Sequence, residues 1–327
     1  MAGRRDLRAA WAARPSVYPR RTWALILALD RLPWPWGEHI MARCFVARAF
    51  VKTTRLRQAL TWASAQRSRA WSRWALTLSL CSYHGRFVAR SAFTGIRDLA
   101  TLHQSFSLRG EEHLAAAGRG VIFLGFHLGP TSPDVALRIA GHRVTWIGPG
   151  LWRIGMDGAW PPEIRHLYER SGGTAVASEG GQLGLRALYR ARRMLLHGEN
   201  IFITADGVGT QAFEVPLPGG PARIRAGWLL LRQATGAPVL PVLSHMEGRT
   251  QVVTVYPSLP SPVADPVRDL DVCRAAIDRL LTDHVRRFPE QCYLLAFRRT
   301  IPTAMRAGDV RQMPAVGGAA RSRVVED

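Results

Sequence analysis

The sequence predicts an α/β protein in which a mostly parallel sheet is flanked by helices and follows a basic helical region. From Val121 onward, short apolar segments of strand type alternate with helix-type segments, which is typical of parallel sheets covered by helices. Before Val121, apolar residues recur at helical spacing. The chain of 327 residues is long enough for one large α/β domain with an appended helical part.

The expected elements of the α/β part follow from these apolar segments. The expected strands are residues 121–126, 144–147, 201–204, 239–243, 251–256 and 293–297. The expected helices are residues 133–141, 162–170, 182–197, 222–235 and 270–287. In a parallel sheet of this kind, functional residues gather where the strands end at their carboxyl termini.

The amino-terminal part has a different pattern. Residues 21–108 are expected to be helical, with a turn at 31–37, because Pro33 and Pro35 are not tolerated inside a helix. We therefore divide the chain into three parts. They are a basic, Trp-rich helical interfacial region (1–110), an α/β core (111–300) and an Ala-, Gly- and Arg-rich tail expected to be disordered (301–327).

The net charge of +20 is concentrated in the amino-terminal region. Residues 1–110 hold 19 basic and 4 acidic residues, which is +15, and they also hold seven of the eleven tryptophans. Arginine with tryptophan suits an anionic surface, either a membrane or a nucleic acid, and the tryptophans favour the membrane. We expect no nucleic-acid partner. A solvated basic face with a few core aromatics is the simpler alternative.

Neither a membrane-spanning segment nor a signal peptide is expected. The longest apolar run of the amino-terminal region, 23–29, is far shorter than the roughly 20 residues that span a bilayer, and no signal peptide is recognisable. The four cysteines are scattered without a Cys-x-x-Cys pair, which predicts a reducing compartment and neither disulfides nor a zinc cluster. The sequence thus predicts a protein that binds a membrane surface peripherally.

The first candidate for catalysis is the segment that follows the expected strand 121–126. His127 comes directly after the strand. A helix is then expected to begin, with Ser132 as its N-cap, Pro133 as its first residue and Asp134 in its first turn. A histidine at this edge can act as a general base if a carboxylate such as Asp134 fixes its tautomer. The alternative is a histidine in a polar turn, with Asp134 only complementing the helix dipole.

Two further segments carry candidate binding residues. Asp206 ends another strand, where it can meet His127 from a neighbouring strand or orient a polar substrate, and Gly207 and Gly209 allow close backbone approach. Arg298 and Arg299 end the last expected strand, where paired arginines can hold an anionic head group or a carrier phosphate. No nucleophile elbow, P-loop or metalloprotease motif is present, so we predict no metal and no nucleotide cofactor.

Together, these motifs resemble the lipid A biosynthesis lauroyl/myristoyl acyltransferase family, within the lysophospholipid acyltransferase superfamily. The resemblance extends from about Trp23 to Arg299 and is tightest in the core. Its segments are Gly120-Val-Ile-Phe-Leu-Gly-Phe-His-Leu-Gly129, Gly198-Glu-Asn-Ile-Phe-Ile-Thr-Ala-Asp206, Phe213-Glu-Val-Pro-Leu-Pro-Gly219, Gly236-Ala-Pro-Val-Leu-Pro-Val242 and Pro289-Glu-Gln-Cys-Tyr-Leu through Arg298-Arg299.

The resemblance implies transfer of a fatty acyl group from acyl carrier protein or acyl-CoA to a hydroxyl of a membrane lipid, such as a lipid A precursor or a lysophospholipid. It implies His127 as general base, Arg170 as a substrate-binding residue, anionic lipids as partners and a peripheral location on the cytoplasmic face of a bacterial inner membrane.

The chain departs from the family pattern at two positions, one after His127 and one after Asp206, where Val208 stands in place of a second acidic residue. The family's acidic residue five positions after the histidine is Ser132 here, so Asp134 is the expected partner. The alternative function is a catalytically altered relative that binds lipid at the interface.

Overall fold

A computed structural model provides the structure of the chain. It describes residues 25, 28–29, 31–47, 54–66, 72–93, 98–130, 133–148, 174–176, 185–206, 212–217 and 221–292. The helix predicted at 162–170, the strand predicted at 293–297 and the predicted tail 301–327 lie outside the described residues.

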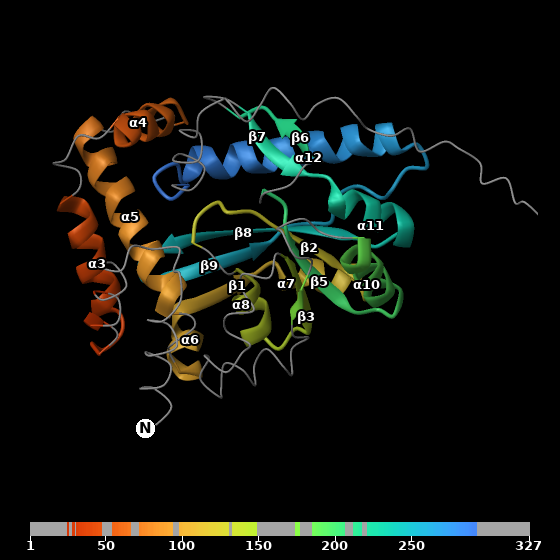
Figure 1. Cartoon of the computed structure of the whole chain (residues 1–327), viewed down its shortest axis with the longest axis horizontal. Helices are drawn as coiled ribbons and strands as arrows, with labels where there is room; N and C mark the ends of the chain where they lie inside the picture. The colour runs from red at the N-terminus through yellow and green to blue at the C-terminus, as the bar shows by residue number, and fades with distance from the viewer. Residues whose placement is uncertain are drawn as a thin grey trace, which may run out of the picture.

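A seven-stranded sheet with the order β1–β9–β8–β2–β5–β3–β4 forms the centre of the molecule (Figure 1). Five of its six neighbouring strand pairs are parallel, and β8 and β9 are antiparallel. The prediction of a mostly parallel sheet is confirmed. The strands are β1 (Phe106–Arg109), β2 (Ile122–Gly125), β3 (Val144–Gly148), β4 (Thr174–Val176), β5 (Asn200–Thr204), β8 (Val239–Glu247) and β9 (Thr250–Val255).

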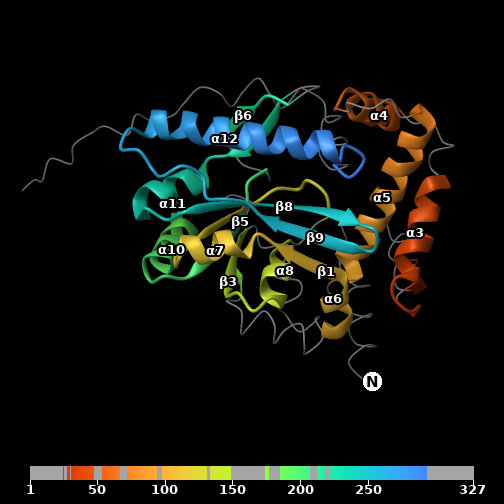
Figure 2. The same ribbon diagram turned by 180° about the vertical axis from the view of Figure 1, so that it is seen from behind.

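Helices cover both faces of this sheet, because successive strand residues point to opposite sides. On β2, Ile122 and Leu124 pack toward one face and Phe123 toward the other. The first face is covered by α10 (Leu185–Leu196), α11 (Gly227–Thr235) and α12 (Pro266–Arg287), and the second by α6 (Leu99–Ser105), α7 (Glu111–Ala117) and α8 (Pro133–Ile139) (Figures 1 and 2).

The longest of these helices, α12, has clear local determinants. The Asp265 side chain caps it by accepting a hydrogen bond from the Val267 amide, and Pro266 occupies its first turn. Its buried residues recur at every fourth position, which gives one apolar stripe facing the sheet. The apolar residues of this stripe are Cys273, Ile277, Leu281 and Val285. The helix predicted at 270–287 is confirmed and begins one turn earlier.

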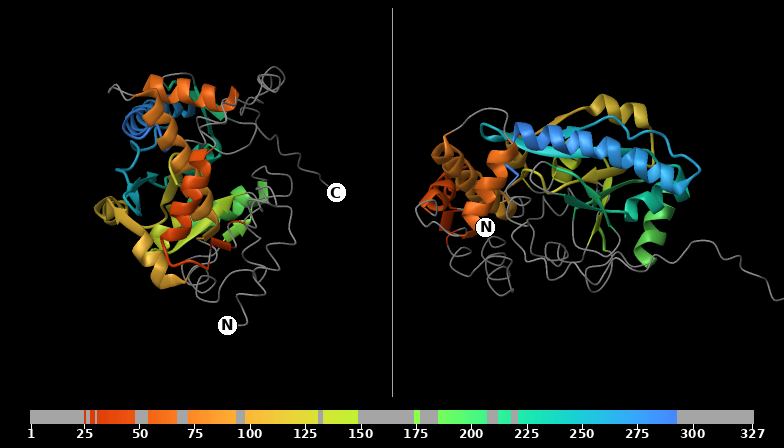
Figure 3. Two further views of the ribbon diagram at one scale, coloured as in Figure 1. Left: turned by 90° about the vertical axis from the view of Figure 1, so that its left-hand side faces the viewer. Right: turned by 90° about the horizontal axis from the view of Figure 1, so that it is seen from above.

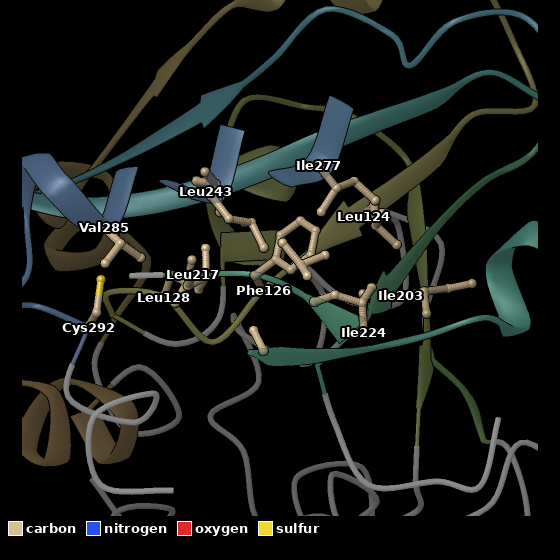
Figure 4. Close-up of a cluster of buried hydrophobic side chains, with 14 of the residues drawn as sticks. Leu124, Phe126, Leu128, Ile203, Leu217, Ile224, Leu243, Ile277, Val285 and Cys292 are labelled. Carbon is tan, nitrogen blue, oxygen red and sulfur yellow. The ribbon is translucent and has the colours of Figure 1, made fainter. Parts of the chain in front are cut away.

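A short hairpin, β6 (Ala212–Val215) and β7 (Ala222–Arg225), packs with α12 over the same face. In Figure 4, Leu217 and Ile224 meet Leu243 of the sheet and Ile277 of α12 in one apolar cluster. The prediction of a helix from residue 222 is therefore wrong for its first four residues. Ala222 and Ile224 are buried and Arg223 is exposed, so the period is that of a strand.

The amino-terminal region is helical where it is described, with α3 (Trp36–Val46), α4 (Thr54–Gln66) and α5 (Arg73–Phe93). The turn predicted at 31–37 is confirmed over residues 31–35, directly before α3. The expectation of helix up to residue 108 is wrong for residues 106–108, which belong to β1 (106–109) and pair with β9. Among the described residues, no helix is long and apolar enough to cross a membrane.

Two arginines of α5, the buried Arg90 and the half-buried Arg86, join these helices to the sheet. The Arg90 guanidinium donates to Glu38 of α3 and to the backbone oxygen of Arg249 in the β8–β9 turn, at 2.9 and 2.8 Å. Arg86 donates to the neighbouring Gly248 oxygen at 2.6 Å. Part of the basic excess of residues 1–110 thus has a structural role. The three helices stand together at one end of the sheet (Figure 3).

Candidate active site

His127 and Asp206 meet at the carboxyl edge of the sheet. Their strands, β2 and β5, are parallel neighbours with Gly125 opposite Thr204, and each of the two residues lies two positions beyond that pair. The ladder continues past the strands, since the Ala205 amide donates to the Gly125 oxygen at 2.8 Å. The contact between His127 and Asp206 therefore follows from strand register.

The Asp206 carboxylate binds His127 through both of its oxygens. Oδ1 lies 2.8 Å from His127 Nδ1, and Oδ2 accepts a hydrogen bond from the His127 backbone amide at 2.9 Å. A carboxylate only accepts, so Nδ1 of the neutral ring carries the proton and Nε2 keeps its lone pair. The His127 side chain is 29% exposed and that of Asp206 13%. The pair thus presents a basic nitrogen to an approaching hydroxyl.

The loop that carries His127 is held against β8 by a close backbone approach. Gly129 has φ +81°, and a Cβ at this position would lie 1.9 Å from the Ser244 carbonyl oxygen. The Ser244 hydroxyl donates to the Pro130 oxygen at 2.7 Å. Only glycine fits such a backbone at low cost, so the loop that carries His127 has a defined position on the sheet.

The segment 289–292 supports this loop from the other side. The Gln291 side chain bonds to both backbone groups of Met246 on β8, at 2.7 and 3.2 Å. The next residue, Cys292, is buried and accepts a hydrogen bond from the Gly129 amide, and burial raises the pKa of its thiol. In Figure 4, Cys292 lies beside Leu128 and Val285. The described part of this motif anchors the loop that carries the histidine.

The expected partner of His127, Asp134, lies elsewhere. It is buried in the first turn of α8, where its Oδ2 is 3.4 Å from Nε of Arg138. Nδ1 of His127 has one hydrogen, and it donates this hydrogen to Asp206. The register of β2 and β5 places Asp206 opposite His127. The position of Asp206, which we expected to meet His127 from a neighbouring strand, is confirmed.

The other predicted binding residues fall outside the described part of the chain. They are Arg170, Gly207, Gly209, Arg298 and Arg299. Within the described residues, no group of three or more His, Cys, Asp or Glu side chains is placed to hold a metal ion. Ser244 and Cys292 are positioning residues that the sequence did not indicate, because their partners are backbone groups of a distant loop.

Comparison with known proteins identifies no family for the chain. No protein-family model matches it, and neither does any curated protein. Among solved structures, it is similar to the 1-acyl-sn-glycerophosphate (LPA) acyltransferase PlsC from Thermotoga maritima. The sequence identity is 15%, the match covers 80% of this chain and 97% of that chain, and the TM-score is 0.36. A similarity at this level assigns neither a family nor an activity.

Proposed function

We propose that the chain is a membrane-associated O-acyltransferase that moves a fatty acyl group from a thioester to a hydroxyl of a membrane lipid. The observation that carries this proposal is the His127–Asp206 pair, which leaves a histidine nitrogen available at the carboxyl edge of a parallel sheet. The sequence motifs around both residues support the same chemistry. The acyl donor is acyl carrier protein or acyl-CoA, and the acceptor is a lipid A precursor or a lysophospholipid.

In the proposed reaction, Nε2 of His127 takes the proton of the acceptor hydroxyl as its oxygen attacks the thioester carbonyl. Asp206 keeps the ring in the required tautomer and stabilises the imidazolium that forms. The tetrahedral intermediate then breaks its carbon–sulfur bond, and the imidazolium returns the proton to the leaving thiolate. The products are an ester and a free thiol, and no acyl-enzyme intermediate is required.

The amino-terminal helices are the proposed membrane-binding part. Trp36 and Trp74 are 60% and 49% exposed, and Arg43 and Arg57 are also exposed on these helices. Tryptophan and arginine together favour the head-group region of an anionic leaflet. This supports a peripheral location, which we propose is the cytoplasmic face of a bacterial inner membrane.

The test is transfer of a radiolabelled dodecanoyl group from either thioester to a bacterial lipid extract. We expect His127→Ala to lose activity by about 10²–10⁴-fold, the usual contribution of a general base. His103→Ala is the matched control, because His103 is exposed on α6. Transfer by His127→Ala at the wild-type rate would refute the proposed base. Lipid binding without any transfer by the wild type would instead indicate an interfacial lipid-binding protein.

A further inference from the structure

The amino end of α11 has backbone donors without acceptors. Helix α11 begins at Gly227, and Ala226 stands at its N-cap, so no side chain caps the helix. In the part of the chain that the structure describes, the amides of Gly227 and Trp228 donate to no acceptor. Free amides at the positive end of the helix dipole favour an anion. The helix end alone does not define a site, but three further features point to a ligand there.

The first feature is a buried indole donor. Trp228 is 1% exposed, yet its Nε1 has no hydrogen-bond partner among the described residues. Side chains of a helix lean toward its amino end, so the Trp228 ring lies over the first turn of α11. A buried N–H without an acceptor is costly, and nearly all such groups in folded proteins have a partner. A ligand oxygen at the helix end would supply the acceptor that the chain lacks.

The second feature is open space beside the first residue of α11. Gly227 is half-buried, and a Cβ added to it would meet no atom of the described chain within 4 Å. A Cβ added to Gly129, in the loop that carries His127, would instead clash with the Ser244 oxygen. The amino end of α11 is therefore open, whereas the loop that carries the candidate base is closely packed.

The third feature is the position of this helix end beside the candidate site. The Arg225 amide, two residues before α11, donates to the Ala205 oxygen at 2.7 Å, and Asp206 is the next residue. In Figure 4, Ile224 of β7 points toward Ile203 of β5 in the same apolar cluster. Strand β8, which follows α11, begins beside the start of β2. Helix α11 therefore runs from the carboxyl edge of the sheet to its amino edge, and its amino end lies on the side of the candidate base.

Arg225 also brings a positive charge to this end of α11. Arg223 and Arg225 lie on the side of β7 opposite the buried Ala222 and Ile224. Arg223 is exposed, whereas Arg225, next to the end of β5, is half-buried. A guanidinium can bind two oxygens of a phosphate at once. The donors and the charge at this position thus suit a phosphate.

We propose that the amino end of α11 binds the phosphate of the acceptor lipid. This inference rests on the proposed acyltransferase function and assigns a phosphorylated lipid as the acceptor. The Gly227 and Trp228 amides and the Trp228 indole donate to the phosphate oxygens, and Arg225 supplies the countercharge. The bound phosphate holds a neighbouring hydroxyl of the same lipid at Nε2 of His127.

The first test is binding of glycerol 3-phosphate and of glycerol, measured by isothermal titration calorimetry. Ala226→Asp places a carboxylate beside the unpaired amides, where it complements the helix dipole and competes with a phosphate. Its midpoint of thermal unfolding should therefore not fall. Val267→Asp is the matched control, because it adds the same charge to the first turn of α12. That turn lies at the other end of α11, where Arg232 pairs with Asp269 at 2.9 Å.

The wild type and Val267→Asp should bind glycerol 3-phosphate and not glycerol, and Ala226→Asp should bind glycerol 3-phosphate at least about tenfold more weakly. Arg225→Gln should also weaken this binding, whereas Arg223→Gln, on the same side of the hairpin, should not. Absence of glycerol 3-phosphate binding by the wild type, or an equal loss in Ala226→Asp and Val267→Asp, would overturn the site.

The second test, acyl transfer from dodecanoyl-CoA, separates the acceptor phosphate from the phosphates of the donor. Ala226→Asp should raise KM for lysophosphatidic acid at least about tenfold and leave kcat/KM for monooleoylglycerol within about twofold of the wild-type value. A raised KM for dodecanoyl-CoA alone, or equal losses with both acceptors, would overturn the assignment to the acceptor. If glycerol 3-phosphate binds as expected but no acyl group is transferred, the phosphate site stands and the proposed function fails.

Discussion

Replacing Arg90 with methionine should destabilise the protein more than any other single arginine substitution on α3 or α5. Arg90 is 3% exposed and donates from its two terminal nitrogens to Glu38, to the Ser105 oxygen and to the Arg249 oxygen, all within 2.9 Å. Its guanidinium thus joins α5 to α3, to the end of α6 and to the β8–β9 turn. Methionine retains much of the side-chain volume but none of these donors.

The expected loss in the free energy of unfolding follows from the polar groups that lose their partner when Arg90 is replaced. The Glu38 side chain is also 3% exposed, so Arg90→Met leaves a buried carboxylate without its cation. Breaking a buried ion pair on one side costs about 3–5 kcal/mol, and the buried Ser105 oxygen and the partly buried Arg249 oxygen each lose a donor as well. The double variant E38M/R90M should recover part of this loss, because replacing both partners by apolar groups removes the unpaired charge.

Chemical denaturation of the wild type, the two single variants and the double variant measures this coupling. The control is Arg43→Met, since Arg43 is exposed on α3 and should change the free energy of unfolding by less than about 0.5 kcal/mol. If Arg90→Met costs no more than Arg43→Met, the amino-terminal helices are not held to the sheet in the way we describe.

Two further predictions concern the loop that carries His127 and a buried histidine. Gly129→Ala should lose more stability and more acyl transfer than Gly141→Ala. Both glycines have positive φ, but an added Cβ at Gly129 meets the Ser244 oxygen and at Gly141 meets nothing within 4 Å; equal losses would contradict the close approach. Burial lowers the pKa of His284 to about 3, so the unfolded chain binds its proton first as pH falls below 6.5. The wild type should therefore lose about 2 kcal/mol more than His284→Phe between pH 7 and pH 5 in urea titrations, and parallel losses would refute this.

Much of the fold could be predicted because the core strands and helices have strong local signals. β2 and β5 lie within one residue of their predicted bounds, and α12 shows both its cap, Asp265, and its apolar stripe in the sequence. The short strands β1, β4, β6 and β7 were missed, and β1 and β7 were predicted as helix, because such short segments also fit a helical pattern. For Ala222–Arg225, the alternation of small or apolar residues with arginine is the signal that favoured a strand.

For the partner of His127 the sequence left two carboxylates open, Asp134 and Asp206, and it favoured Asp134. His127 and Asp206 both follow strand-type segments, which places each at the carboxyl edge of the sheet. Nothing in the sequence shows that β5 lies beside β2, because β3 and β4 come between them along the chain. Asp134 is nearer to His127 in sequence, yet it enters a helix and contacts Arg138. The order of the strands decided which carboxylate orients the histidine.

The measurement that tests the central claim most directly is acyl transfer by Asp206→Asn compared with Asp134→Asn. If Asp206 orients His127 as the base, Asp206→Asn should lower kcat by about 10²–10⁴-fold. Asp134→Asn should keep kcat per folded molecule near the wild-type value, with thermal unfolding recorded for both variants. Wild-type kcat in Asp206→Asn, or a large loss of kcat confined to Asp134→Asn, would contradict the proposed catalytic pair.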